Sequence, residues 1–260
     1  MMKTSAFSLI LASAIALPQL SAQGILPTDG GSQPAPQIEA DVIADWVKEL
    51  SNLSAEDRAL YTSSFAKAKS AYAKGLMAEC ESHLNTCEFY TTSNPNVWNL
   101  RASVRISQQR FEEAKPLLDA VRRFNPQDSV ARLSLSLLYL GTQEFDKCMA
   151  ETEELMDEIM YRDMMQLSRS LTFRKFLCLI MQERMDEAKA LVSDIGPMDD
   201  SPLYYYSQAV FAYVKGDRQG ALRELNAADA IYRSIGYLSG YKQALEYSGL
   251  IEKFAPGSAK

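Results

Sequence analysis

Residues 95–128, PNVWNLRASVRISQQRFEEAKPLLDAVRRFNPQD, carry two short apolar stripes at helical spacing with a polar break between them. The stripes and the break consist of Trp98, Ala102 and Ile106, then Gln108-Gln109-Arg110, then Phe111, Ala114, Leu118 and Val121. Two antiparallel helices approach closely only where small side chains meet, and Ala102 and Ala114 are placed to face each other. The stretch therefore predicts a helical hairpin that ends before Asn125-Pro126.

The same arrangement recurs along the chain. A step along the chain by the length of the stretch 95–128 leads from Ala114 back to Cys80 and forward to Cys148, both small and apolar. The same step leads from Phe111 to Met77 and Phe145. After a step about six residues longer, the arrangement resumes at Ala188 and then at Ala221. The sequence predicts about five copies, over residues 54–94, 95–128, 129–162, 163–201 and 202–235.

This unit resembles the tetratricopeptide repeat, a helix-turn-helix of about 34 residues with characteristic tryptophan, small, aromatic and closing proline positions. The residues that carry the resemblance are Trp98, Ala102, Ala114, Leu118 and Pro126, and in the last copy Tyr205, Ala209, Gly216, Ala221, Leu225 and Ala228. Arg101 and Arg105 depart from it, since leucine and tyrosine are usual there. The resemblance implies an all-α right-handed superhelical stack of such hairpins, an α-solenoid.

The first residues read as a signal peptide for export. Lys3 precedes an apolar run over residues 6–17, and cleavage is expected after Ala22. The run is too short to span a bilayer, which takes about 20 apolar residues. An uncleaved amphipathic or anchoring helix is the alternative. Residues 23–37 are rich in glycine and proline and predict a flexible linker.

Extra helices are expected at both ends of the stack, because an end repeat would otherwise expose its stacking face. An amphipathic stripe predicts an N-terminal helix over residues 38–53, and Ser54 with Asp57 predicts a helix cap directly after it. Tyr237, Tyr241, Leu245 and Leu250 predict one C-terminal capping helix over residues 236–254, followed by a tail at 255–260.

Composition limits the classes of partner and cofactor. The net charge of −6 argues against nucleic acid, and no cofactor motif, metal-ligand spacing or membrane span is recognisable. Acidic residues gather in residues 144–163, where either a solvated outer helix face or a docking surface for a basic partner is possible. Several methionines after residue 148 are interpreted as core filling of an imperfect repeat rather than a soft-metal site.

Reactive side chains are few. The cysteines at 80, 87, 148 and 178 are expected to be buried free thiols, with one pairing between repeats left open. His83 is the single histidine and is expected on an outer helix face. We therefore expect no enzyme activity and no catalytic residues. The alternative is an accessory subunit or enzyme of the cell envelope whose unrecognised active site uses His83.

By resemblance, the first helices of the repeats line a concave, mostly apolar groove that takes up a partner peptide or helix. The residues implied are Asn99, Ser103, Leu133, Leu137, Phe173, Leu177, Tyr206, Val210 and Tyr213. The lysine and asparagine set with which some family members bind a terminal carboxylate is not reproduced. An apolar groove is normally covered, here by a partner segment, a second copy of the chain or its own N-terminal segment. Alternatively, the register differs and these residues are interhelical core.

The sequence thus predicts an exported protein–protein interaction scaffold, periplasmic or secreted, that binds another protein in this groove during bacterial envelope assembly. The bacterial setting follows from the resemblance. Phe173, Tyr206 and Tyr213 are the expected aromatic anchors.

Overall fold

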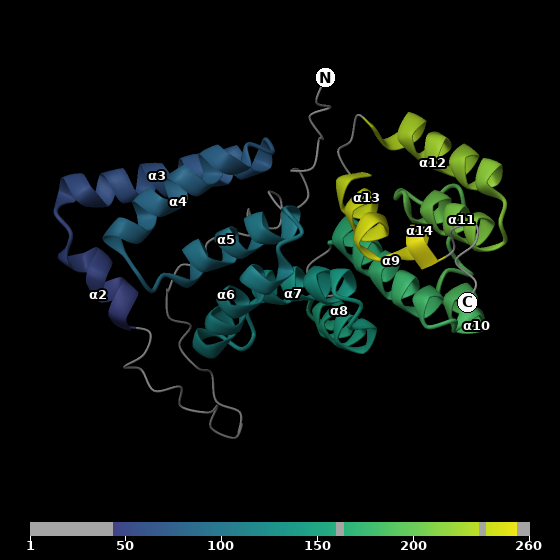
Figure 1. Ribbon diagram of the computed structural model, residues 1–260, viewed down its shortest axis with the longest axis horizontal. Helices are drawn as coiled ribbons and strands as arrows, with labels where there is room; N and C mark the ends of the chain where they lie inside the picture. The colour runs from purple at the N-terminus through teal and green to yellow at the C-terminus, as the bar shows by residue number, and fades with distance from the viewer. Residues whose placement is uncertain (1–43, 160–163, 234–237, 254–260) are drawn as a thin grey trace, which may run out of the picture.

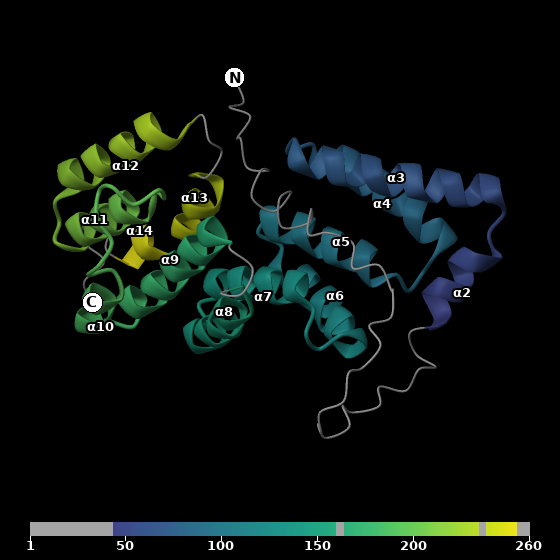
Figure 2. The same ribbon diagram turned by 180° about the vertical axis from the view of Figure 1, so that it is seen from behind.

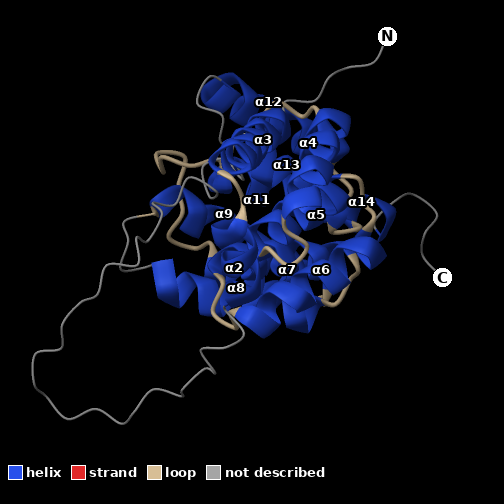
Figure 3. Ribbon diagram, turned by 90° about the vertical axis from the view of Figure 1, so that its left-hand side faces the viewer, coloured by secondary structure: helices blue, strands red, loops and turns tan. Residues whose placement is uncertain are grey.

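The structure, a computed structural model, describes residues 44–159, 164–233 and 238–253, and all regular secondary structure in these ranges is helical (Figure 3). The all-α class is therefore confirmed for this part of the chain. The predicted signal peptide at 1–22, the linker at 23–37 and the tail at 255–260 lie outside the described residues, as does the start of the predicted N-terminal helix.

Most helices pack in consecutive pairs, which follow one another along the long axis of the molecule (Figures 1 and 2). After α2 (Ala44–Asn52), the pairs are α3 (Ala55–Ala73) with α4 (Met77–Tyr90), α5 (Pro95–Ser107) with α6 (Phe111–Phe124), α7 (Ser129–Gly141) with α8 (Phe145–Ile159), α9 (Met165–Met181) with α10 (Met185–Leu191), and α11 (Leu203–Val214) with α12 (Arg218–Tyr232). Each pair lies within one of the five segments expected from the sequence.

Polar side chains fix where several of these helices begin. The Ser54 hydroxyl accepts a hydrogen bond from the backbone N–H of Asp57 at 3.0 Å, as its spacing predicts. The carboxylate of Asp128 accepts from the N–H of Ala131 at 2.8 Å, and the carboxylate of Asp217 accepts from the N–H of Gly220 at 2.7 Å. A helix whose first N–H groups are satisfied in this way has a defined start.

The turns inside the five pairs share one backbone geometry. Each contains a residue with positive φ, and the next residue donates its N–H to the carbonyl five positions back at 2.8–2.9 Å, the arrangement of a Schellman motif. The positive-φ residues are Gly75, Gln109, Gln143, Glu183 and Gly216. A left-handed residue at the same place in every pair lets each second helix fold back on the first, so all five pairs close alike.

The closing alanines lie where the sequence places them. Ala102 and Ala114 are both fully buried in the main core, which runs from α5 to the C-terminal helices. A smaller core joins α3, α4 and one face of α5. The small residues expected at the equivalent place of the other pairs, Cys80, Cys148, Ala188 and Ala221, are also buried.

The C-terminal segment differs from the single capping helix expected. It forms α13 (Leu238–Tyr247) and the short α14 (Leu250–Lys253), which are separated at Gly249, where φ is 71°. Moreover, α13 does more than cover the last pair: it packs against α7 and α9 in the middle of the molecule (Figure 1). The apolar residues Leu238, Tyr241 and Ala244 form a stripe along α13, and this stripe is buried.

Candidate functional site

The residues expected to line the groove are mostly interior. Asn99, Ser103, Leu133, Leu137, Phe173, Leu177, Tyr206 and Val210 are buried, and Tyr213 alone is half-buried. Leu137, Phe173, Leu177, Tyr206 and Val210 belong to one continuous core, whereas Leu133 belongs to a separate small cluster with Leu155 and Leu171. The structure therefore has no open groove at these positions.

The chain's own helix α13 takes the place of a groove ligand. The ring of Tyr241 lies 5.2 Å from that of Phe173 and 5.1 Å from that of Tyr206, measured between centroids. At the end of α13, the Tyr247 hydroxyl donates to the backbone carbonyl of Ile106 at 2.8 Å. The expected anchors Phe173 and Tyr206 thus contact the C-terminal helix, a covering segment that was not among the expected candidates.

One apolar pocket remains open at the end of the molecule where α11, α12, α13 and α14 meet. Its lining includes Val210 and Tyr213 of α11, Leu222 and Leu225 of α12, Leu245 of α13 and Ile251 of α14. The cavity has a volume of about 240 Å³. Leu222 is 58% exposed and Ile251 is 51% exposed, so two large aliphatic side chains stand at its rim.

Tyr213 and Arg218 define one wall of this pocket. The Tyr213 hydroxyl donates to the carbonyl of Ile251 at 3.2 Å, which ties α11 to α14. The guanidinium of Arg218 lies 5.5 Å from the centroid of the Tyr213 ring, in cation–π geometry. Val210 and Tyr213 are thus the two expected groove residues that line this pocket.

Sequence reasoning missed the rest of the pocket. Leu222 and Leu225 follow Arg218 by about one and two turns, so α12 carries an apolar stripe that extends past its buried Ala221 and Ala228. That stripe could have been recognised. The contributions of Leu245 and Ile251 could not, because they depend on where α13 and α14 fold back.

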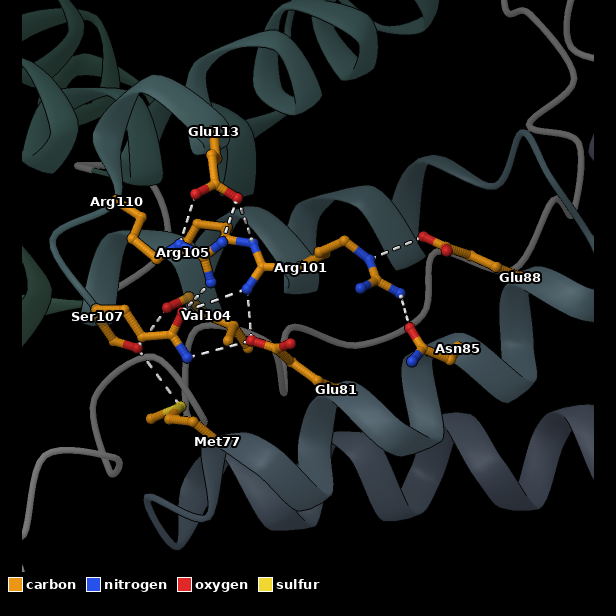
Figure 4. A network of polar contacts seen from close by, with 11 residues as sticks. Met77, Glu81, Asn85, Glu88, Arg101, Val104, Arg105, Ser107, Arg110 and Glu113 are labelled. Carbon is orange, nitrogen blue, oxygen red and sulfur yellow. Dashed lines mark hydrogen bonds and ion pairs between the residues drawn. The ribbon is translucent and has the colours of Figure 1, made fainter.

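Arg101 and Arg105, the departures from the repeat resemblance, join neighbouring pairs (Figure 4). Arg101 donates to Glu88 at 2.8 Å and to Asn85 at 2.9 Å, both on α4. Arg105 donates to Glu81 at 2.5 Å and lies 3.4 Å from Glu113 of α6. These arginines are largely buried at the α4–α5 contact, so their role in the structure is to link helices.

The acidic stretch at 144–163 is largely paired within the described residues. Glu151 accepts from Arg122 at 2.5 Å, Glu153 lies 2.7 Å from Lys175, Glu154 lies 2.8 Å from Arg132, and Glu144 pairs with Lys147. Hydrogen bonding to Lys147 lowers the pKa of Glu144. These pairs neutralise much of α8, which favours the solvated structural face over a docking surface; residues 160–163 lie outside the described part.

All four cysteines are buried. Burial raises the pKa of Cys80 to about 12 and that of Cys87 to about 11. Cys148 of α8 and Cys178 of α9 lie in hydrogen-bond contact, which with burial raises the pKa of Cys178. Nearby, the buried guanidinium of Arg174 donates to the carbonyl of Leu133 at 3.0 Å and to the Ser136 hydroxyl at 2.6 Å.

His83 and the metal-ligating residue types are the remaining candidates for a reactive site. The His83 ring nitrogen Nε2 lies 3.9 Å from a carboxylate oxygen of Glu79 on the same helix, and this is its one ion-pair contact there. Over residues 44–159, 164–233 and 238–253, no group of three or more His, Cys, Asp and Glu side chains is placed to hold a metal ion. In the same ranges, no helix is long and apolar enough to cross a membrane.

The chain was compared with models of known protein families and with curated proteins, and neither comparison gives a match.

Proposed function

We propose that this protein is a non-catalytic scaffold of tetratricopeptide type that binds an apolar segment of another protein in the pocket between α11, α12, α13 and α14. The observation that carries the proposal is an apolar cavity with Leu222 and Ile251 exposed at its rim. Exposed aliphatic side chains around an apolar hollow cost free energy in water, and a partner that covers them recovers it.

Several features support the stacked-repeat part of the proposal. The five helix pairs are closed by the same left-handed turn, and successive turns are 33 or 34 residues apart except for one step of 40 residues, from Gln143 to Glu183. A right-handed superhelical stack of such hairpins exposes large surfaces relative to its length, which suits a binding scaffold. In this proposal α13 is a built-in part of the stack, and the partner binds beside it rather than in the groove it fills.

The proposed setting is outside the cytoplasm. The apolar run at 6–17 and the small residues at 21–22 support export, with the mature chain beginning at Gln23 in the periplasm or the medium and serving envelope assembly. The mass of the protein recovered from a periplasmic fraction tests this directly. A mass that includes residues 1–22 would contradict it.

The pocket is tested by photocrosslinking in living cells. A photoreactive amino acid at Leu222 is expected to give a discrete adduct with one protein, whereas the same amino acid at Leu60, which is exposed on α3 at the other end, gives none. Adding Ile251→Asp should abolish the adduct while the helical circular dichroism is retained. Equal adducts at both positions, or an adduct that is insensitive to Ile251→Asp, would refute the assignment.

A further inference from the structure

A cation lines the apolar pocket although the chain as a whole is acidic. The chain has a net charge of −6, yet Arg218 lines the pocket and Lys215 is exposed in the turn that precedes it. Among the described residues, neither cation has a carboxylate partner. The guanidinium of Arg218 instead lies over the ring of Tyr213. Most other arginines of the described chain are paired with acids, so Arg218 is an exception.

Asp217, the acid next to Arg218 in the sequence, is held by other groups. One oxygen of Asp217 accepts the N–H of Gly220 at 2.7 Å, and the other lies 3.7 Å from Arg223. Arg223 is two residues from Leu225 and does not line the pocket. The carboxylate of Asp217 is therefore engaged at the start of α12, and the guanidinium of Arg218 remains available above the opening.

The size of the cavity limits what enters it. A volume of about 240 Å³ lies below the range of roughly 300–1,000 Å³ that is usual for sites that enclose a whole small molecule. One large apolar side chain of a peptide fits within such a space, and the residues beside it in the peptide remain at the rim. A neighbouring acidic residue would then face Arg218.

We propose that the pocket binds a protein segment in which a bulky apolar side chain is followed or preceded by an aspartate or glutamate, the apolar group entering between Leu222 and Ile251 and the carboxylate pairing with Arg218. This inference rests on the proposed function of the pocket and specifies its partner. The apolar contact supplies most of the affinity, and the ion pair selects among apolar segments, because an exposed ion pair contributes little by itself.

Three peptides that differ at one position test the inference. They are acetylated, amidated hexapeptides with one phenylalanine preceded by aspartate, asparagine or lysine, and each is titrated into isotope-labelled protein while the amide signals of Ala221 and Leu225 are followed. The aspartate peptide is expected to bind roughly fivefold more tightly than the asparagine peptide, and the lysine peptide is expected to bind most weakly.

Two protein variants separate the causes. In Arg218→Gln the three peptides should bind with equal affinity, whereas in Arg223→Gln, which makes the same charge change on the same helix, the order should persist. Equal binding of all three peptides to the unmodified protein would overturn the inference about the acidic residue but would not contradict the proposed function of the pocket. If no peptide shifts the pocket signals, the proposed function of the pocket fails as well.

Discussion

Replacing Tyr241 with alanine tests whether α13 is part of the cooperative core or a removable cover. Tyr241 is 1% exposed and contacts the rings of Phe173 and Tyr206. A buried tyrosine removes about 150 Å² or more from water, which at about 25 cal/mol per Å² corresponds to about 4 kcal/mol. We expect Tyr241→Ala to lower the free energy of unfolding by about this amount, a large part of a typical domain's stability.

Urea unfolding followed by circular dichroism gives the loss, and native-state hydrogen exchange gives its location. Since α13 packs on α7 and α9, amides in those helices should exchange roughly a thousandfold faster in the variant, and amides of α3 and α4, which belong to the separate small core, should change little. Phe89→Ala is the matched control, because this aromatic ring is 83% exposed and should contribute under about 0.5 kcal/mol. A loss below about 1 kcal/mol, or faster exchange within α13 alone, would show that α13 detaches independently and that the groove beneath it opens.

Three further substitutions follow from the structure. Gln109→Gly should raise the free energy of unfolding by about 0.5–1 kcal/mol in urea titrations, because φ is 57° at this position and glycine adopts it without strain; an unchanged or lower value would contradict this. Gly141→Ala should lower the melting temperature, with a loss of about 1–3 kcal/mol, because an added Cβ would lie 2.4 Å from the ring of Phe111; an unaltered melting temperature would mean that the ring moves aside freely. Burial raises the pKa of Cys80 to about 12, so the folded protein keeps this proton at pH values where the unfolded thiol has already lost it. The contribution of Cys80 to the free energy of unfolding is therefore fully present below about pH 9 and is lost as the pH rises toward 12. Between pH 9 and pH 10.5 this should remove about 1.5 kcal/mol, and a Cys80→Ala variant with the same pH dependence as the parent protein would refute that attribution.

Much of the local structure could be predicted from the sequence because it depends on nearby residues. The stripes around Ala102 and Ala114 predict a helix pair, and both alanines are buried in it. Ser54 predicts a helix start that the hydrogen bond to Asp57 confirms. Helix periodicity and capping depend on residues within about two turns, so they can be predicted without knowledge of the fold.

The geometry of the turns could be predicted only in part from the sequence. Gly75 and Gly216 mark left-handed positions in the first and last pairs, but Gln109, Gln143 and Glu183 occupy the equivalent positions without a distinguishing side chain. Each positive-φ residue instead precedes the small closing residue of its pair by five positions, and this register carries the information. A residue type that tolerates positive φ is a weaker signal than the register in which it recurs.

The candidate site was the least predictable feature. The residues that were expected to form the groove are apolar and on the first helices of the pairs, yet all but Tyr213 are buried in the structure. An apolar stripe on a helix shows that something covers it and does not show what. Only Val210 and Tyr213 line an accessible pocket, because α13 and α14 leave that end partly open.

By itself, the sequence determined the all-helical class, the order of the helix pairs and the small residues that close the best-defined pair, because local periodicity and close packing within a pair leave few alternatives. Only the tertiary structure decided that α13 lies against α7 and α9 and that the pocket with Leu222 and Ile251 forms beside it. The apolar stripe of α13 is the same whether the helix covers the last pair or packs in the middle of the molecule. Its position is set by the total apolar area that each arrangement buries, which depends on residues far apart in the chain.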